Sequence, residues 1–81
     1  MKLRVKLFAV ARQRAAAEWL EIDLPEGASV EQMRAALALS CPPLAEVLPH
    51  VRFAINSEYA SENQPIPAAA EIALIPPVSG G

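Results

Sequence analysis

Residues 2–8 read KLRVKLF, a stretch in which polar and apolar side chains alternate. Three apolar side chains share one face of an extended chain: Leu3, Val5 and Leu7. The other face carries three cations and an aromatic ring: Lys2, Arg4, Lys6 and Phe8. A period of two is typical of a β-strand with one buried face, and it predicts a strand over residues 3–9.

A second alternating stretch, WLEIDL at residues 19–24, carries the opposite charge. The side chains expected to face outward are Trp19, Glu21 and Asp23. We expect the two strands to pair antiparallel, because carboxylates then lie opposite cations and stabilise the sheet modestly. This pairing accounts for most of the basic cluster in residues 1–14, which hold five of the seven Lys and Arg residues and no carboxylate.

One main helix is predicted after the turn PEG at residues 25–27. Ser29 is suited to cap this helix, and Gln32, three residues later, completes a capping box. An apolar stripe at helical spacing follows: Val30, Met33, Ala36 and Leu37. The helix should end before the CPP at residues 41–43, because proline disfavours helix at the preceding residue. A short helical turn is expected over residues 44–48.

Three further strands are predicted, at residues 51–55, around Tyr59 and at residues 71–75. A proline-bracketed loop at residues 63–67 separates the last two. The order strand, strand, helix, strand, short strand, strand predicts an α+β fold of the β-grasp type. This fold is a mixed sheet of four to five strands, with the main helix packed on one face and the last strand in the middle.

Size and composition predict one domain over residues 1–75, followed by a tail at residues 76–81. No apolar run approaches the roughly 20 residues of a membrane span. The apolar stretch at residues 7–11 is too short for a signal peptide. With a single cysteine and a formal net charge of −2, we expect a cytoplasmic protein that binds neither nucleic acid nor membrane.

No catalytic or metal-binding constellation is visible in the sequence. His50 is the single histidine and Cys41 the single cysteine, so neither a zinc site nor a Cys–His nucleophile pair is complete. Gly27 stands alone, which excludes a glycine-rich phosphate loop. We therefore expect no catalytic residue, no metal and no stably bound cofactor.

The outward face of the predicted sheet is less polar than a solvated face. Alternation places Phe8, Trp19, Ala73 and Ile75 on it, and Phe8 and Ile75 become neighbours if the last strand runs beside the first. Exposed apolar patches of this kind usually mark a docking surface. The alternatives are that Lys and Arg stems cover these side chains, or that the register differs by one residue.

The C-terminus, IPPVSGG at residues 75–81, holds two of the three glycines of the chain. Pro76 and Pro77 favour a stiff, extended segment. Gly80 and Gly81 carry no side chains, so the end is thin enough to enter a narrow channel of a partner. A terminal carboxylate becomes reactive once it is converted to an acyl-adenylate, and we favour this function over a frayed end.

Three stretches resemble, in order, the small subunit of molybdopterin synthase: KLFAVARQR at 6–14, VRFAINSEYAS at 51–61 and IALIPPVSGG at 72–81. The resemblance spans essentially the whole chain, and PPVSGG is its most specific part. It implies a ubiquitin-like β-grasp fold with a flexible C-terminal tail. It also implies that Gly81 carries first an adenylate and then a thiocarboxylate. The remaining tail residues would insert into a partner: Pro76, Pro77, Val78, Ser79 and Gly80.

The resemblance further implies two partners. An activating enzyme would use ATP to adenylate Gly81, and the large subunit of the synthase would use the sulfur to build the dithiolene of molybdopterin. Two small and two large subunits would assemble, with the catalytic residues in the large one. Phe8, Ile75 and Tyr59 would contact the partner. In one departure, AAA at residues 68–70 stands where many relatives have a Gly-Asp turn.

Other functions are compatible with the same tail. A thiamine-pathway sulfur carrier has the same fold, but its members usually lack the proline-rich insert at residues 41–50 and the PPV arm. A ubiquitin-like modifier would attach the terminus to lysines of other proteins. A plain interaction domain would be unaffected by the loss of Gly80 and Gly81.

Overall fold

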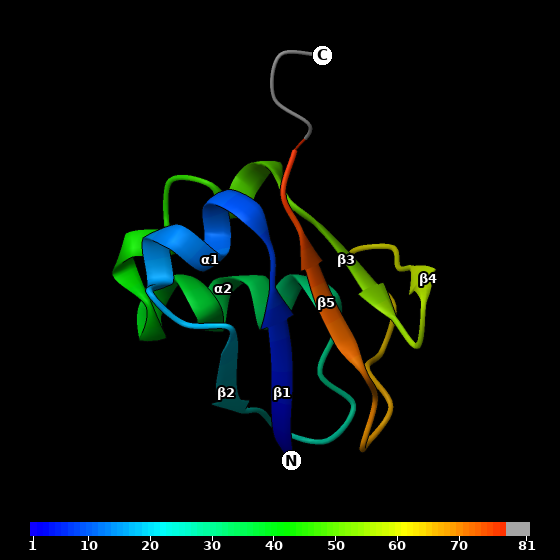
Figure 1. The fold of residues 1–81 in the computed structure, drawn as a ribbon. Helices are drawn as coiled ribbons and strands as arrows, with labels where there is room; N and C mark the ends of the chain where they lie inside the picture. Colours follow the sequence, from blue (N-terminus) through cyan, green and yellow to red (C-terminus); the bar gives the residue numbers. More distant parts are fainter. Residues whose placement is uncertain (78–81) are drawn as a thin grey trace.

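The computed structural model describes residues 1–77, in which five strands form one mixed sheet of order β2-β1-β5-β3-β4 (Figure 1). The strands are β1 (Lys2–Leu7), β2 (Trp19–Asp23), β3 (Arg52–Ile55), β4 (Glu58–Tyr59) and β5 (Ile72–Ile75). Strand β5 is parallel to β1, and the other neighbours are antiparallel. The β-grasp prediction is confirmed, including the last strand in the middle of the sheet.

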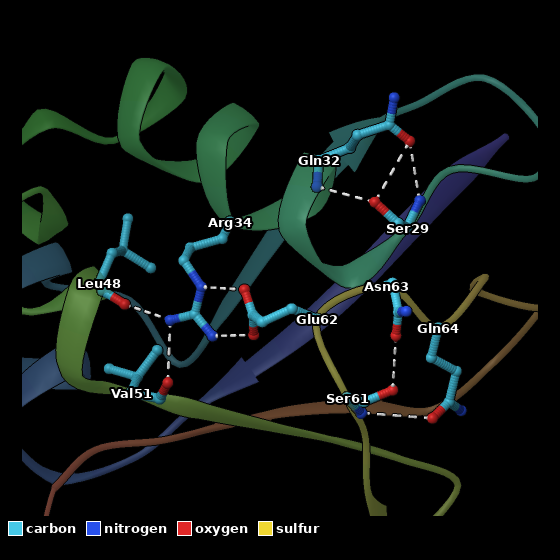
Figure 2. A network of polar contacts seen from close by, with 9 residues as sticks. All are labelled: Ser29, Gln32, Arg34, Leu48, Val51, Ser61, Glu62, Asn63 and Gln64. Carbon is cyan, nitrogen blue, oxygen red and sulfur yellow. Dashed lines mark hydrogen bonds and ion pairs between the residues drawn. The ribbon is translucent and has the colours of Figure 1, made fainter.

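The main helix is α2 (Val30–Ser40), and it begins and ends where the sequence predicts. Ser29 and Gln32 form the capping box: the Gln32 N–H donates to Ser29 Oγ at 3.2 Å, and the Ser29 N–H donates to Gln32 Oε1 at 2.8 Å (Figure 2). Val30, Met33 and Leu37 are fully buried, as the apolar stripe predicts. No helix within residues 1–77 is both long enough and apolar enough to span a bilayer.

Two short elements differ from the prediction. A second helix, α1 (Ala9–Ala15), follows β1 directly, so the strand ends at Leu7 rather than at residue 9. Phe8 is the extended N-cap residue of α1 and forms no side-chain cap. The sequence therefore lacks the Ser, Thr, Asp or Asn that usually indicates the start of a helix. The helical turn expected over residues 44–48 is a single hydrogen-bonded turn, in which the Val47 N–H donates to the Leu44 carbonyl at 3.0 Å. Two 3₁₀ turns that were not predicted flank it, η1 (Pro42–Leu44) and η2 (Leu48–His50).

The core lies between the sheet and α2. Buried side chains alternate along the strands, as Leu3, Val5 and Leu7 do in β1. The largest fully buried ones are Phe53, Leu3, Leu7, Met33, Leu37, Leu44, Leu48 and Leu74. Because the core covers one face of the sheet, the other face is left open.

Arg34 on α2 ties three segments together (Figure 2). Its Nε donates to Glu62 Oε1 at 3.0 Å, and a second nitrogen donates to Glu62 Oε2. Its third nitrogen donates to the backbone carbonyls of Leu48 and of Val51, the latter at 2.9 Å. The hydrogen bond from Arg34 stabilises the carboxylate and lowers the pKa of Glu62 below its ordinary value. The loop that carries Glu62 is thereby joined to α2 and to the start of β3.

Candidate functional site

The predicted tail starts at the C-terminal end of β5, the central strand. The backbone of β5 is paired with β1 on one edge and with β3 on the other. Pro76 is half-buried and Pro77 is exposed, and neither can donate to a ladder. The tail therefore begins at a fixed point, at the end of the sheet where β1 also ends (Figure 1). The other predicted tail residues lie outside the described residues: Val78, Ser79, Gly80 and Gly81.

One row of side chains crosses all five strands on the open face. The register aligns Trp19 with Lys6, Lys6 with Ala73, Ala73 with Ala54, and Ala54 with Tyr59. Cross-strand neighbours point to the same side of a sheet, so all five share the open face. Trp19 is 40% exposed and Tyr59 59% exposed, whereas both alanines are half-buried. The row, here called the trough, thus has an aromatic ring at each end and two small side chains in its floor.

The next row toward the tail contains two of the predicted docking residues. Arg52 pairs with Ile75, and continuing the β1–β5 register by one residue brings Phe8 level with Ile75. Phe8 is 39% exposed and Ile75 is half-buried. The third predicted docking residue, Tyr59, lies in the trough on the edge strand β4. The fold therefore places all three on the open face, with Phe8 and Ile75 in the row beside the start of the tail and Tyr59 one row further away at the sheet edge.

Three cations of the open face lie over aromatic rings. No ion pair within residues 1–77 involves any of them. Basic stems therefore do cover the apolar patch in part, but the rings beneath them stay exposed. The distances from cation to ring centroid are 4.3 Å for Arg4 over Trp19, 5.5 Å for Lys6 over Trp19 and over Phe8, and 4.0 Å for Arg52 over Tyr59.

The open face is hollowed on both sides of Trp19. A hollow of about 170 Å³ lies over the part of the trough between Trp19 and Ala54, and Glu71 and Ser57 border it on the side away from the tail. A second, of about 290 Å³, lies against Trp19 and Arg4 toward the N-terminus of β1. The first exists because two adjacent central strands both present alanine to the open face.

The other candidate groups are not assembled into a site. Cys41 is a free, half-buried cysteine at the C-cap of α2, and His50 is exposed in η2. Within residues 1–77, no group of three or more His, Cys, Asp or Glu is arranged to hold a metal ion. A depression of about 630 Å³ lies against α1, and its ionisable lining residues are Arg12 and Glu18. In the described part of the chain, the open face beside the tail is the strongest candidate for a binding site.

Sequence reasoning assigned no binding role to three residues of this face: Lys6, Arg52 and Ala54. Alternation at residues 51–55 already places Arg52 and Ala54 opposite the buried Phe53. The missing information was the strand order, which sets β3 beside β5 and so joins Ala54 to Ala73.

Comparison with known proteins relates the whole chain to one family. Residues 5–81 match the ThiS family. An Arabidopsis thaliana protein named molybdopterin synthase sulfur carrier subunit is 35% identical over 81 residues, which are all of this chain and 84% of that protein. The crystal structure of SAMP1 from Haloferax volcanii is 30% identical with a TM-score of 0.87, and all of both chains is covered. A chain from the complex of subunits 1 and 2 of the molybdopterin-converting factor of Helicobacter pylori is 26% identical with a TM-score of 0.69, again over all of both chains.

Proposed function

Because the chain belongs to the ThiS family, we propose that it is the sulfur carrier subunit of a molybdopterin synthase. The observation that carries the proposal is the full-length relationship to proteins of that name: 35% identity to the plant protein, and 32% to one from Chlamydomonas reinhardtii over all of both chains. The fold supports it, because the central strand β5 leads directly into the Pro-Pro-Val-Ser-Gly-Gly tail.

The proposed chemistry takes place at the carboxylate of Gly81. In an activating enzyme, one carboxylate oxygen attacks the α-phosphorus of ATP, pyrophosphate leaves, and an acyl-adenylate forms. A hydrosulfide ion (HS⁻) supplied by a donor then attacks the acyl carbon, AMP leaves with the former carboxylate oxygen, and loss of the S–H proton to water leaves a thiocarboxylate. The carrier itself supplies no catalytic group and binds ATP only through its partner.

The large subunit of the synthase is the second proposed partner. It would receive the tail, take up the sulfur for the dithiolene of molybdopterin, and assemble with the carrier as two small and two large subunits in the cytoplasm. Four residues follow Pro77, and an extended chain of four residues spans at most about 14 Å. The sulfur acceptor would therefore lie within that distance of Pro77, so the large subunit would contact the end of the sheet where the tail begins, and we propose that it does so through Phe8 and Ile75.

Intact-mass measurement tests the proposal. The chain is incubated with ATP, the activating enzyme of its own organism and a sulfur donor, beside a variant that lacks Gly81. We expect a mass gain equal to the exchange of one oxygen for one sulfur in the wild type and none in the variant. The absence of this gain, under conditions in which an established carrier is converted, would contradict the proposal.

A second candidate function, protein modification, is favoured by one neighbour. SAMP1 is named small archaeal modifier protein 1, and its fold superposes on this chain with a TM-score of 0.87. An acyl-adenylate reacts with a lysine amine as well as with sulfur, so the same tail serves both reactions. Recovery from cells of lysine-linked conjugates that require Gly81, without any thiocarboxylate, would favour the modifier over the carrier.

A further inference from the structure

We propose that the large subunit places one apolar side chain in the trough and sets carboxylates against Lys6 and Arg52. The inference rests on the proposed function, since the occupant is the protein that receives the tail. It names the chemistry of the matching surface: an apolar projection flanked by acidic side chains.

The shape of the trough argues for a single inserted side chain. Ala54 and Ala73 are direct cross-strand partners and form its floor, while Trp19 and Tyr59 stand at its two ends. The hollow over this floor measures about 170 Å³, and Glu71 and Ser57 form its border away from the tail; by volume alone, about 150 Å³ is enough to hold benzene. One leucine or phenylalanine side chain of a partner therefore fits, and the Trp19 ring beside it supplies apolar contact area.

The charges of the open face are sorted along the strands. In the two rows nearest the tail, the charged side chains are Lys6 and Arg52, both cations. The carboxylates lie further from the tail. On β2, Glu21 is opposite Arg4 and Asp23 is opposite Lys2, and Glu71, just before β5, lines the hollow on its side away from the tail. The end of the face beside the tail is thus basic, although the chain has a net charge of −2. A complementary partner surface is acidic.

The cations of these rows are available to a partner. Arg52 lies 4.0 Å from the ring centroid of Tyr59, and Lys6 lies 5.5 Å from that of Trp19. Neither cation forms an ion pair within the described residues 1–77. A carboxylate that approaches from a partner meets an oriented cation and displaces no existing ion pair.

Two observations select the large subunit over a second copy of this chain. The trough would meet Lys6 and Arg52 of the second copy, so cations would face cations, which opposes self-association. In addition, Ala73 in the floor of the trough lies in β5, four residues before Pro77, where the tail leaves the sheet. A protein that binds the tail is therefore brought against the trough, so the two contacts form one continuous interface.

Titration calorimetry with the purified large subunit and the unmodified carrier tests the inference. Ala54→Leu fills the trough, and Arg52→Glu reverses its charge. Ala35→Leu makes the same size change on the exposed side of α2, and Lys2→Glu reverses an exposed cation at the far end of the same face. Each trough variant should weaken binding roughly tenfold or more, while each control stays within about twofold. Raising the salt from about 50 to about 500 mM should weaken the wild type more than Arg52→Glu.

The outcomes separate the inference from the proposed function. A wild-type carrier that does not bind the large subunit at all would contradict the proposed function. A wild type that binds, with both trough variants as tight as the controls, would overturn the inference and leave the function standing. Sedimentation of the free carrier supplies a further outcome: a dimer that Ala54→Leu dissociates would assign the trough to a second copy and overturn the inference. Circular dichroism of every variant verifies that it is folded.

Discussion

Replacing Arg34 by alanine should lower the free energy of unfolding by about 3 kcal/mol. The two hydrogen bonds to the Leu48 and Val51 carbonyls contribute about 1 kcal/mol each, because they are partly shielded from water. The pair with Glu62 adds about 0.5 kcal/mol, since that carboxylate is 51% exposed. The guanidinium also lies 5.0 Å from the Phe53 ring centroid, a contact that contributes about 0.5 kcal/mol.

The loss is large for a chain of this size. A domain of 81 residues has a total stability of about 4–12 kcal/mol. The Arg34→Ala variant should therefore fold with a clearly lower urea midpoint, and its melting temperature should fall by roughly 12 °C or more. Urea unfolding is followed by far-UV circular dichroism and by the fluorescence of Trp19, the single tryptophan.

Two further variants separate the contributions. Glu62→Gln removes only the carboxylate and should cost about 0.5–1 kcal/mol. Arg34→Lys keeps the charge but lacks the planar fork that reaches both carbonyls and the carboxylate, so it should cost about 2 kcal/mol. If Arg34→Ala costs no more than Glu62→Gln, the carbonyl bonds contribute nothing and the assignment of Arg34 as a three-way tie is wrong.

Three more predictions concern single features of the fold. The pKa of Glu62 is lowered in the folded protein. The ionised Glu62 therefore stabilises the fold above the ordinary glutamate pKa of about 4.3, and this stabilisation is lost as the pH falls through the lowered value. The difference in unfolding free energy between the wild type and Glu62→Gln should shrink when urea titrations move from about pH 6 to about pH 3. Ala69 has a φ of 60°, in the left-handed region that favours glycine. Ala69→Gly should therefore raise the unfolding free energy by about 0.5–1 kcal/mol, whereas Ala68→Gly, at a residue without positive φ, should lower it slightly. Equal effects of the two substitutions in thermal melts would contradict the strain argument. Ser29→Ala removes the helix cap and should cost about 1 kcal/mol in urea unfolding, and a cost near zero would mean that the cap contributes little.

The strands and the main helix could be predicted because their signals are local. Alternation in β1 and β2 reports burial directly, and the capping box fixes the first turn of α2. Helix α1 lacks such signals at both ends. It follows Phe8, which provides no side-chain cap, and it ends at Ala16 in the left-handed conformation, where glycine is the usual signal. Its seven residues are held instead by burial of Ala11, a tertiary effect that no local pattern encodes.

The candidate site was predictable only in part, for a related reason. Exposure of Phe8 and Trp19 follows from alternation within one strand, and the structure confirms it. The trough depends on four strand pairings at once, and these join residues up to 67 positions apart, from Lys6 to Ala73. A small side chain such as Ala54 gives no signal of its own, because its contribution is the space that it leaves between its neighbours.

The position of β5 connects the fold with the proposed chemistry. Ordering a flexible chain segment on binding costs about 1–2 kcal/mol of conformational free energy for each residue. Binding a partner incurs no such cost for β5, because β1 and β3 already hold this strand along both edges. Pro76 and Pro77 limit the next two residues to a narrow range of φ. Terminal glycines, however, bring no side chains to bury, so insertion of the tail alone gives a partner little apolar contact. Under the proposed function, much of the apolar contact would come from a surface close to the start of the tail, and the trough and the Phe8–Ile75 row are the apolar groups that the sheet presents there.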